Sequence, residues 1–307
     1  TIGTRTGGSA PTQQGFTRVP LPWFPDPAAV DPTRVVWLYP LSSAPTRRKP
    51  NVLAWGALRG IVVSLTRLQT CDSLADTVAA WGAEPAWVGG FDLPFGLPRE
   101  LVETLGWPTE WSALMDHYQQ LTRPEIRDAF AGFCAARPVG GKFAHRQTDG
   151  PAGSSPSMKW VNPPVAYMLH AGVPLLRQVA ASFPGIQPAS QLTPRIALEA
   201  YPALLAREAI DKRSYKSDDV AKQDADRLLA RKDIITRLEA GTSRLNLRLR
   251  LTHAQRDAVI HDGKGDALDA ALCLMQAAWA LVQHQSGHPC YGLPEALDPL
   301  EGWIVTA

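Results

Sequence analysis

The stretch that most constrains the fold is KGDALDAALCLMQAAWALVQH, which covers residues 264–284. Its longest apolar run, Ala270 to Val282, is interrupted by Gln276. The run is shorter than the roughly 20 residues that a membrane-spanning helix needs. A helix that is apolar on all sides is typical of the buried centre of a globular protein. We therefore expect a buried helix here and no membrane partner.

Two aspartates three residues apart open this helix. Asp266 and Asp269 share one helical face, because positions i and i+3 lie one above the other. Carboxylates in a first turn commonly cap the helix and interact favourably with its positive end. Two carboxylates on one face also suit a divalent metal, which prefers oxygen ligands. The choice between a cap and a metal site depends on whether other acids converge there.

The composition fits a globular protein without excluding many functions. The chain has 307 residues, of which 45% are hydrophobic, and this is enough for one large or two ordinary domains. A formal charge of +2 does not mark a polyanion binder, so any nucleic-acid contact must come from local basic patches. The cysteines lack the paired spacings of a zinc site or a disulfide framework, and no secretion signal is visible. We expect reduced thiols in a cytoplasmic protein at Cys71, Cys134, Cys273 and Cys290.

The first half of the domain reads as three strands, a helix and a fourth strand. Residues 1–33 are rich in Gly, Pro and Thr without periodicity, and we interpret them as an arm or poorly ordered leader. Apolar and β-branched runs then predict strands, and the Arg59-Gly60 turn predicts a hairpin. The expected elements are strands over 34–39, 51–58 and 60–68, a helix over 72–81, and a buried strand over 85–92 that ends at Asp92.

The second half adds a helical insertion before the last strand. Helices are expected over 108–121 and 123–137, each with a proline in its first turn. The irregular stretch 138–164 carries a local basic patch that includes Arg146 and Lys159, or it is a solvated insertion. A helix over 165–183 leads to a strand over 195–202, and 217–252 reads as charged and helical. We place the insertion at about 98–190 in a mixed α/β fold.

Acids that are distant in the chain are expected to meet at one edge of this sheet. Ligands of open α/β sheets bind beyond the carboxyl ends of the parallel strands. Asp92 and Glu199 lie at such ends, and Asp266 and Asp269 open the last helix. Clustered carboxylates repel one another unless a cation neutralises them, and two Mg²⁺ or Mn²⁺ ions suit phosphodiester cleavage.

Each acid also has a structural interpretation. Asp92 could cap the turn that begins with Leu-Pro, and Glu199 could pair with a buried Arg207 or Arg231.

Several motifs together resemble one family. They are GGFDLPFGLPRELVETLGWP, KFAHRQTDGPAGSSPSMKWVNPPVA, ALEAYPALLARE, RSYKSDD, DALDAALC and DPLEGWIV. The chain from Arg34 to its last residue resembles the family called domain of unknown function 429, a set of predicted RNase H-like nucleases. The resemblance implies a single RNase H-like domain over 34–307, with a mixed sheet in the order βββαβαβα and a divalent metal held by acids.

The resemblance also implies roles for individual residues. Asp92 matches the acid after the fourth strand, Asp269 with Asp266 matches the aspartates of the final helix, and Glu199 matches the glutamate of EAYP. These residues would be catalytic, with Asp92, Asp266 and Asp269 as metal ligands. Lys216 and Arg231 match basic positions that suit phosphate contact or charge balance.

The sequence departs from the family at the end of the first strand. Pro40 stands where relatives would carry a metal-binding aspartate, and proline has neither a ligand oxygen in its side chain nor a backbone donor. Losing that acid puts catalysis in doubt. The next basic run, Arg47, Arg48 and Lys49, could still bind phosphate.

Three functions follow from these observations. The leading hypothesis is a metal-dependent nuclease acting on DNA or RNA, impaired by Pro40. The alternative is a catalytically inactive nucleic-acid or nucleotide-binding protein of the same fold. The third, phosphoryl transfer to a small molecule, lacks the support of a GxxxxGK phosphate loop.

Overall fold

The computed structural model describes residues 35–38, 45–47 and 49–307. In this part of the chain, six strands form one mixed sheet in the order β5-β4-β1-β2-β3-β6. β1 pairs antiparallel with β2 and parallel with β4, β2 pairs antiparallel with β3, and β5 and β6 are parallel to their neighbours. The strands are β1 (Val35–Leu38), β2 (Asn51–Arg59), β3 (Val62–Cys71), β4 (Trp87–Phe91), β5 (Arg195–Glu199) and β6 (Arg248–Arg250). The protein is therefore a mixed α/β protein, with the predicted hairpin and the predicted strands β2 to β5 confirmed.

Both faces of the sheet are buried, and this explains why the sequence of β2 is almost wholly apolar. Val52 and Ala54 belong to one hydrophobic cluster, whereas Leu53 and Trp55 belong to another. Successive side chains of a strand point to opposite faces, so the two clusters lie on opposite sides of the sheet. A strand covered on both sides reads as a continuous apolar run.

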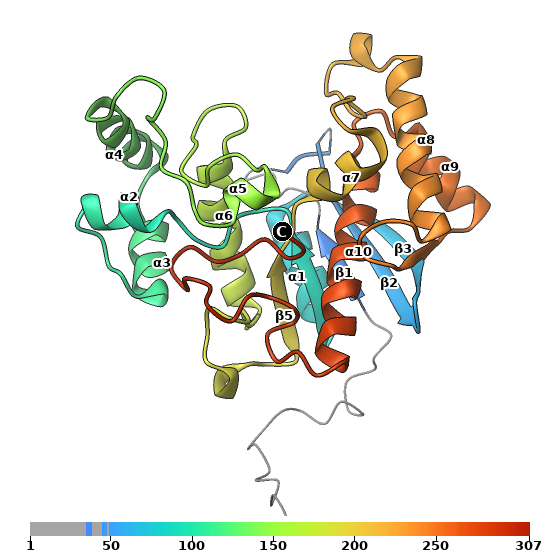
Figure 1. The fold of residues 1–307 in the computed structure, drawn as a ribbon, viewed down its shortest axis with the longest axis horizontal. Coiled ribbons are helices and arrows are strands. Elements are labelled where there is room, and N and C mark those ends of the chain that lie inside the picture. The colour runs from blue at the N-terminus through green and yellow to red at the C-terminus, as the bar shows by residue number, and fades with distance from the viewer. Residues whose placement is uncertain (1–34, 39–44, 48) are drawn as a thin grey trace, which may run out of the picture.

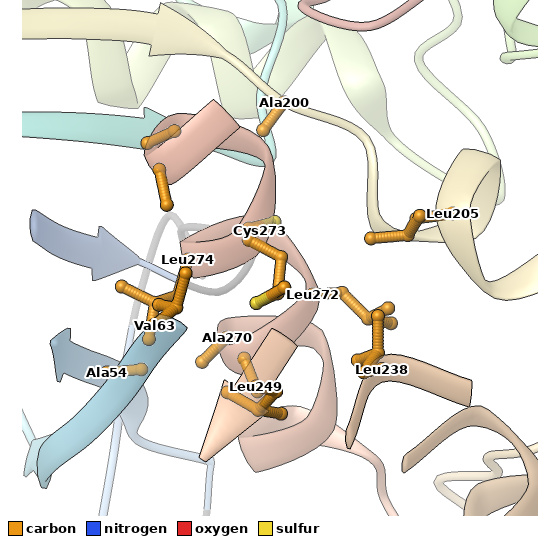
Figure 2. Close-up of a cluster of buried hydrophobic side chains, with 14 of the residues drawn as sticks. Ala54, Val63, Ala200, Leu205, Leu238, Leu249, Ala270, Leu272, Cys273 and Leu274 are labelled. Carbon is orange, nitrogen blue, oxygen red and sulfur yellow. The ribbon is translucent and has the colours of Figure 1, made fainter. Parts of the chain in front are cut away.

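The predicted apolar helix forms the centre of one cluster. α10 (Asp266–Gln285) contacts β1, β2 and β4, and Figure 2 shows Ala270, Leu272 and Leu274 of this helix among side chains from the sheet and neighbouring elements. It also contacts β3, α7 and α9. The helices on this side are α7 (Pro202–Ile210), α8 (Ala225–Ala240), α9 (His253–His261) and α10.

The polar residue that interrupts the apolar run has a structural role. Gln276 is fully buried, and its side-chain oxygen accepts a hydrogen bond from the backbone N–H of Tyr201 at 3.1 Å. Its amide donates to the carbonyl oxygen of Val305 at 3.2 Å and to Thr306 Oγ1 at 2.9 Å. The helix thereby fixes both the turn after β5 and the last residues of the chain.

The second cluster contains side chains from most of the helices between β3 and β5. α1 (Leu74–Ala83) precedes β4, and the predicted insertion between β4 and β5 is largely helical. Figure 1 shows α2 to α4 at one end of the molecule and α8 with α9 at the other. The insertion consists of α2 (Arg99–Thr104), α3 (Trp111–Gln120), α4 (Arg123–Ala135), α5 (Asp149–Ala152) and α6 (Val165–Gln178), with the 3₁₀ turn Ala189–Gln191 before β5.

Two details differ from the sequence predictions. The stretch 217–252 is not helical throughout, because it begins with the 3₁₀ turn Val220–Lys222 and ends in β6. β6 has only three residues, with Leu249 buried and both arginines exposed, so its sequence carries almost no strand period. The short helix α5 lies inside the predicted irregular stretch. The leader over 1–33 and Pro40 lie outside the described residues.

Two further features of the described residues concern the cysteines and the apolar helices. Cys71, Cys134, Cys273 and Cys290 are free thiols. Across residues 35–38, 45–47 and 49–307, no single helix is long and apolar enough to cross a membrane, and only the pair α9 and α10, bent by 118°, passes by length and composition.

Candidate functional site at the sheet edge

Parallel pairing brings two of the predicted acids to one edge of the sheet. Phe91 of β4 is in register with Glu199 of β5, and Asp92 directly follows Phe91. β2 runs in the opposite direction, so its first residue, Asn51, lies at this same edge. The edge at which β4 and β5 end is called the site edge below.

The head of α10 contributes Asp269, and this residue is not a helix cap. The backbone N–H of Ala267 is capped by the carboxylate of Asp262 at 2.9 Å. The helix begins after Gly265, whose φ of +78° is a conformation that side chains rarely adopt. A Cβ at this position would lie 2.7 Å from Cβ of Lys216, so glycine also permits the close approach of the Lys216 segment.

Asp269 is fully buried and is held by two neighbouring residues. Tyr215 Oη donates a hydrogen bond to Asp269 Oδ1 at 2.5 Å, and Lys216 Nζ donates to Asp269 Oδ2. Burial raises the pKa of Asp269, while Lys216 and Tyr215 oppose this shift. Burial alone would lower the pKa of Lys216, but the carboxylates of Asp269, Asp92 and Asp266 outweigh it and raise that pKa. Lys216 is thus a charged ammonium among three acids.

Asp92 differs from Asp269 because its carboxylate has no hydrogen-bond or ion-pair partner among the described residues. The pKa of Asp92 is raised to about 7, chiefly by burial. The charge of Lys216 opposes this rise, and the charges of Asp269 and Glu199 add to it. The turn-cap interpretation of Asp92 therefore has no hydrogen bond to support it. Asp92, Lys216 and Asp269 form one electrostatically coupled group at the site edge, to which Asp266 adds through its interaction with Lys216.

Glu199 is neutralised by an arginine from the insertion. Arg146 Nη1 donates to Glu199 Oε2 at 2.8 Å and Nη2 donates to Oε1 at 2.7 Å, a bidentate pair in which both residues are buried. The backbone N–H of Phe95 donates to Glu199 Oε2 at 3.0 Å. The sequence-based pairing with Arg207 or Arg231 is wrong, because the partner that reaches β5 comes from the irregular stretch.

The same arginine connects three segments of the chain. Arg146 Nη2 also donates to Asp149 Oδ1 at 3.0 Å, and Nη1 donates to the carbonyl oxygen of Glu301 at 3.0 Å. Ser154 Oγ donates to Asp149 Oδ1 at 2.9 Å. This buried network, called the Arg146 network below, consists of Arg146, Asp149, Ser154, Glu199 and Glu301. It fixes the insertion to the end of β5 and to the last segment of the chain.

The predicted phosphate-binding residues fall into two groups. Arg47 and Lys49 are exposed just before β2, at the site edge, and Lys49 Nζ lies 3.1 Å from Asp218 Oδ2. Arg48 lies outside the described residues. Lys159 is half-buried in the insertion. Arg146 and Arg231 are instead buried and bound to protein acceptors; Arg231 Nε donates to the carbonyl oxygen of Ile260 at 2.6 Å and Nη1 to that of Tyr215 at 2.7 Å.

A cavity of about 360 Å³ opens beside the coupled acids. Asp92 and Lys216 line it, as do Arg146 and Glu199 of the buried network.

Sequence reasoning missed three of the residues around this site. Tyr215 lies within RSYKSDD, Tyr201 follows the EAYP glutamate by two residues, and Asp149 lies in the stretch 138–164, where no local pattern marks it.

The arrangement fits a divalent cation only in part. Asp92 offers a carboxylate that has no hydrogen-bond or ion-pair partner among the described residues. Its ionisation is opposed first by burial and then by neighbouring acids, and a cation would relieve the repulsion from those acids. Asp269, however, is already bound by Lys216 and Tyr215. Over residues 35–38, 45–47 and 49–307, the structure contains no group of three or more His, Cys, Asp or Glu side chains that could hold a metal.

Comparisons of the chain with family models, with curated proteins and with solved structures find no match.

Proposed function

We propose that this chain is a divalent-metal-dependent nuclease with an RNase H-like sheet, acting on the phosphodiester bonds of DNA or RNA. The observation that carries the proposal is the carboxylate of Asp92, which has no hydrogen-bond or ion-pair partner in the described part of the chain and interacts electrostatically with Lys216 and Asp269 at the site edge. The order of β1 to β5, in which an antiparallel start is followed by two parallel strands, supports the RNase H-like interpretation.

In this proposal the residues at the site edge have different roles. Asp92 and Asp269 would hold Mg²⁺ or Mn²⁺, with Asp266 as the third ligand that the family resemblance implies. The bound metal would supply a water activated for attack and would stabilise the leaving oxygen. Lys216, with 36% of its side chain exposed, balances the charge of Asp269 and can contact a phosphate. Glu199 keeps a supporting role, since Arg146 already neutralises it.

A cleavage assay tests the proposal. The purified protein with Mg²⁺ or Mn²⁺ should cut single-stranded, duplex or branched nucleic acid, and Asp92→Asn and Asp269→Asn should each lower the rate by at least about 100-fold. Asp128→Asn is the matched control, because Asp128 is 67% exposed on α4. If neither the natural chain nor a Pro40→Asp variant cuts any of these substrates, the nuclease proposal is wrong.

The alternative function is nucleic-acid binding without cleavage. It is favoured by the hydrogen bonds that Lys216 and Tyr215 make to Asp269, because an acid held by protein donors is less available to a metal. A binder would retain the same nucleic acids with an affinity that falls steeply with salt and would leave them intact in Mg²⁺ and Mn²⁺.

A further inference from the structure

The cavity at the site edge has walls that the proposed chemistry does not require. One side consists of Asp92, Leu93 and Pro94, which directly follow β4. Further lining comes from the insertion, where Pro163 precedes α6 and Val165 and Met168 lie in its first turn. The insertion therefore completes a compartment next to the coupled acids.

The charged groups of this cavity neutralise one another. Arg146 is paired with Glu199, and Lys216 with Asp269. Asp92 adds one further acid, so the cavity offers no excess of positive charge to a phosphate. Most of the remaining lining is apolar, with hydroxyl groups from Ser154, Ser155 and Tyr201. Such a lining suits an uncharged and mostly apolar group with a few polar atoms at its edge.

The size of the cavity fits a single nucleobase rather than a nucleic-acid double helix. Ligand pockets for small molecules span about 300–1,000 Å³, and this cavity of about 360 Å³ is near the lower end. A double helix cannot enter such a space, whereas one unstacked base can. Proteins that act on a single base or a single strand commonly take the base out of its stack into such a pocket.

We propose that this cavity binds one unstacked nucleobase, and that the attached phosphodiester lies at the rim of the cavity, beside the partly exposed Lys216 and the cation that Asp92 would hold. This inference rests on the proposed function and narrows its substrate class to single-stranded or locally opened nucleic acid. The base contacts the apolar wall formed by Val165 and Met168, and the hydroxyls of Ser155 and Tyr201 bind its edge. The insertion thus selects the substrate, and the sheet edge carries the phosphate chemistry.

Two variants fill the cavity, and one adds the same bulk outside it. Ala203→Trp places an indole in the cavity from the first turn of α7, and Ser155→Trp does so from the insertion. Because Ser155 lies in an irregular segment, its variant keeps the test valid if Ala203→Trp does not fold. Val161→Trp is the control, since Val161 is 52% exposed and does not line the cavity.

Calorimetric titration without metal measures the binding of four ligands: nucleosides, ribose 5-phosphate, a single-stranded oligonucleotide and a blunt duplex. The comparison shows whether the cavity binds free nucleosides or only bases within a strand. Nucleosides and the single strand should bind one site, ribose 5-phosphate should not, and both cavity variants should weaken binding at least tenfold while Val161→Trp does not. The proposal is overturned if nucleosides fail to bind at millimolar concentration, or if duplex binds as tightly as single strand and neither cavity variant changes it. Nucleoside binding by a protein that cuts nothing would reject the nuclease and keep the pocket.

Discussion

Asp92 is the residue whose ionisation we expect to affect the stability of the fold. Burial raises its pKa to about 7 in the folded protein, against an ordinary value of 3.8. The folded state therefore holds this proton more tightly than the unfolded chain does. The resulting stabilisation is complete below the unfolded pKa and is lost as pH rises to about 7, above which the buried charge destabilises the fold.

Asp92→Asn should consequently stabilise the protein in a pH-dependent way. We expect the free energy of unfolding to rise by about 4 kcal/mol at pH 8 and to change much less at pH 4, because an amide never carries the charge. Urea denaturation at both pH values measures the difference. Asp218→Asn is the control, since Asp218 is 72% exposed, and it should change little at either pH. An equal effect of Asp92→Asn at both pH values would contradict this assignment.

Arg146 is the residue whose loss should cost most stability near the site. Arg146→Met would leave the buried carboxylates of Glu199 and Asp149 without their counter-ion. Breaking a buried pair by removing one partner typically destabilises by about 3–5 kcal/mol, because a buried charge remains uncompensated. Thermal and urea unfolding of the variant should show a loss of this order.

The control for Arg146→Met is an arginine of the same chemistry at the surface. Arg177 Nη1 lies 2.7 Å from Asp116 Oδ1, and the two side chains are 29% and 53% exposed. Arg177→Met should cost less than about 1 kcal/mol, as is usual for solvated pairs. Equal losses in the two variants would mean that the Arg146 network does not contribute through its buried charges.

At the scale of elements, the loop after β4 packs closely against the backbone of the last segment of the chain, and Gly96 is the point of closest approach. A Cβ on Gly96 would lie 2.2 Å from the carbonyl oxygen of Leu300 and 2.6 Å from that of Glu301. Both contacts are to backbone, which cannot yield as a flexible side chain does. Gly96→Ala should therefore separate the loop from the last segment of the chain and destabilise the protein by about 3 kcal/mol.

The opposite sign is expected for the same substitution in α4. Gly132 is exposed within this helix, and a Cβ there meets nothing within 4 Å. Gly132→Ala should stabilise the protein by up to about 1 kcal/mol through helix propensity. Parallel urea denaturation of the two variants measures both effects. If both variants lose stability, the close approach at Gly96 is not what distinguishes them.

The elements that could be predicted are those whose residues carry a strong local pattern. The strand that ends at Asp92 and the apolar helix from Asp266 follow from continuous apolar runs, and the hairpin follows from its turn. β6 could not be predicted, because three residues at a sheet edge contain one buried side chain and no period. Its strand conformation comes from pairing with β3.

The candidate site could be predicted only as a set of residues. The position of Asp92 beside Asp269 follows from the rule that parallel strands end at one edge, together with an apolar helix that must cross the sheet. The partner of Glu199 could not be predicted, since Arg146 precedes it by 53 positions in a stretch whose sequence shows no helix or strand period. Which arginine reaches a buried acid is decided by the path of the insertion, and no local pattern encodes that path.

For the whole molecule, the two edges of the sheet should behave differently toward nucleic acid. Arg47 and Lys49 precede β2 at the site edge, whereas Arg59 lies at the turn between β2 and β3, at the opposite edge. All three are exposed, so composition and net charge alone do not distinguish them. Only the topology predicts which of these cations contacts a phosphate of a strand bound at the acids.

The salt dependence of binding measures this difference. Each phosphate neutralised on a single strand contributes about 0.7 to the slope of log affinity against log salt concentration. Arg47→Ala and Lys49→Ala should each reduce the slope by roughly that amount and weaken binding to all sequences alike, because phosphate contacts carry no base information. Arg59→Ala should leave both slope and affinity unchanged. A slope that falls equally in all three variants would mean that nucleic acid binds by diffuse charge, and that the site edge does not direct it.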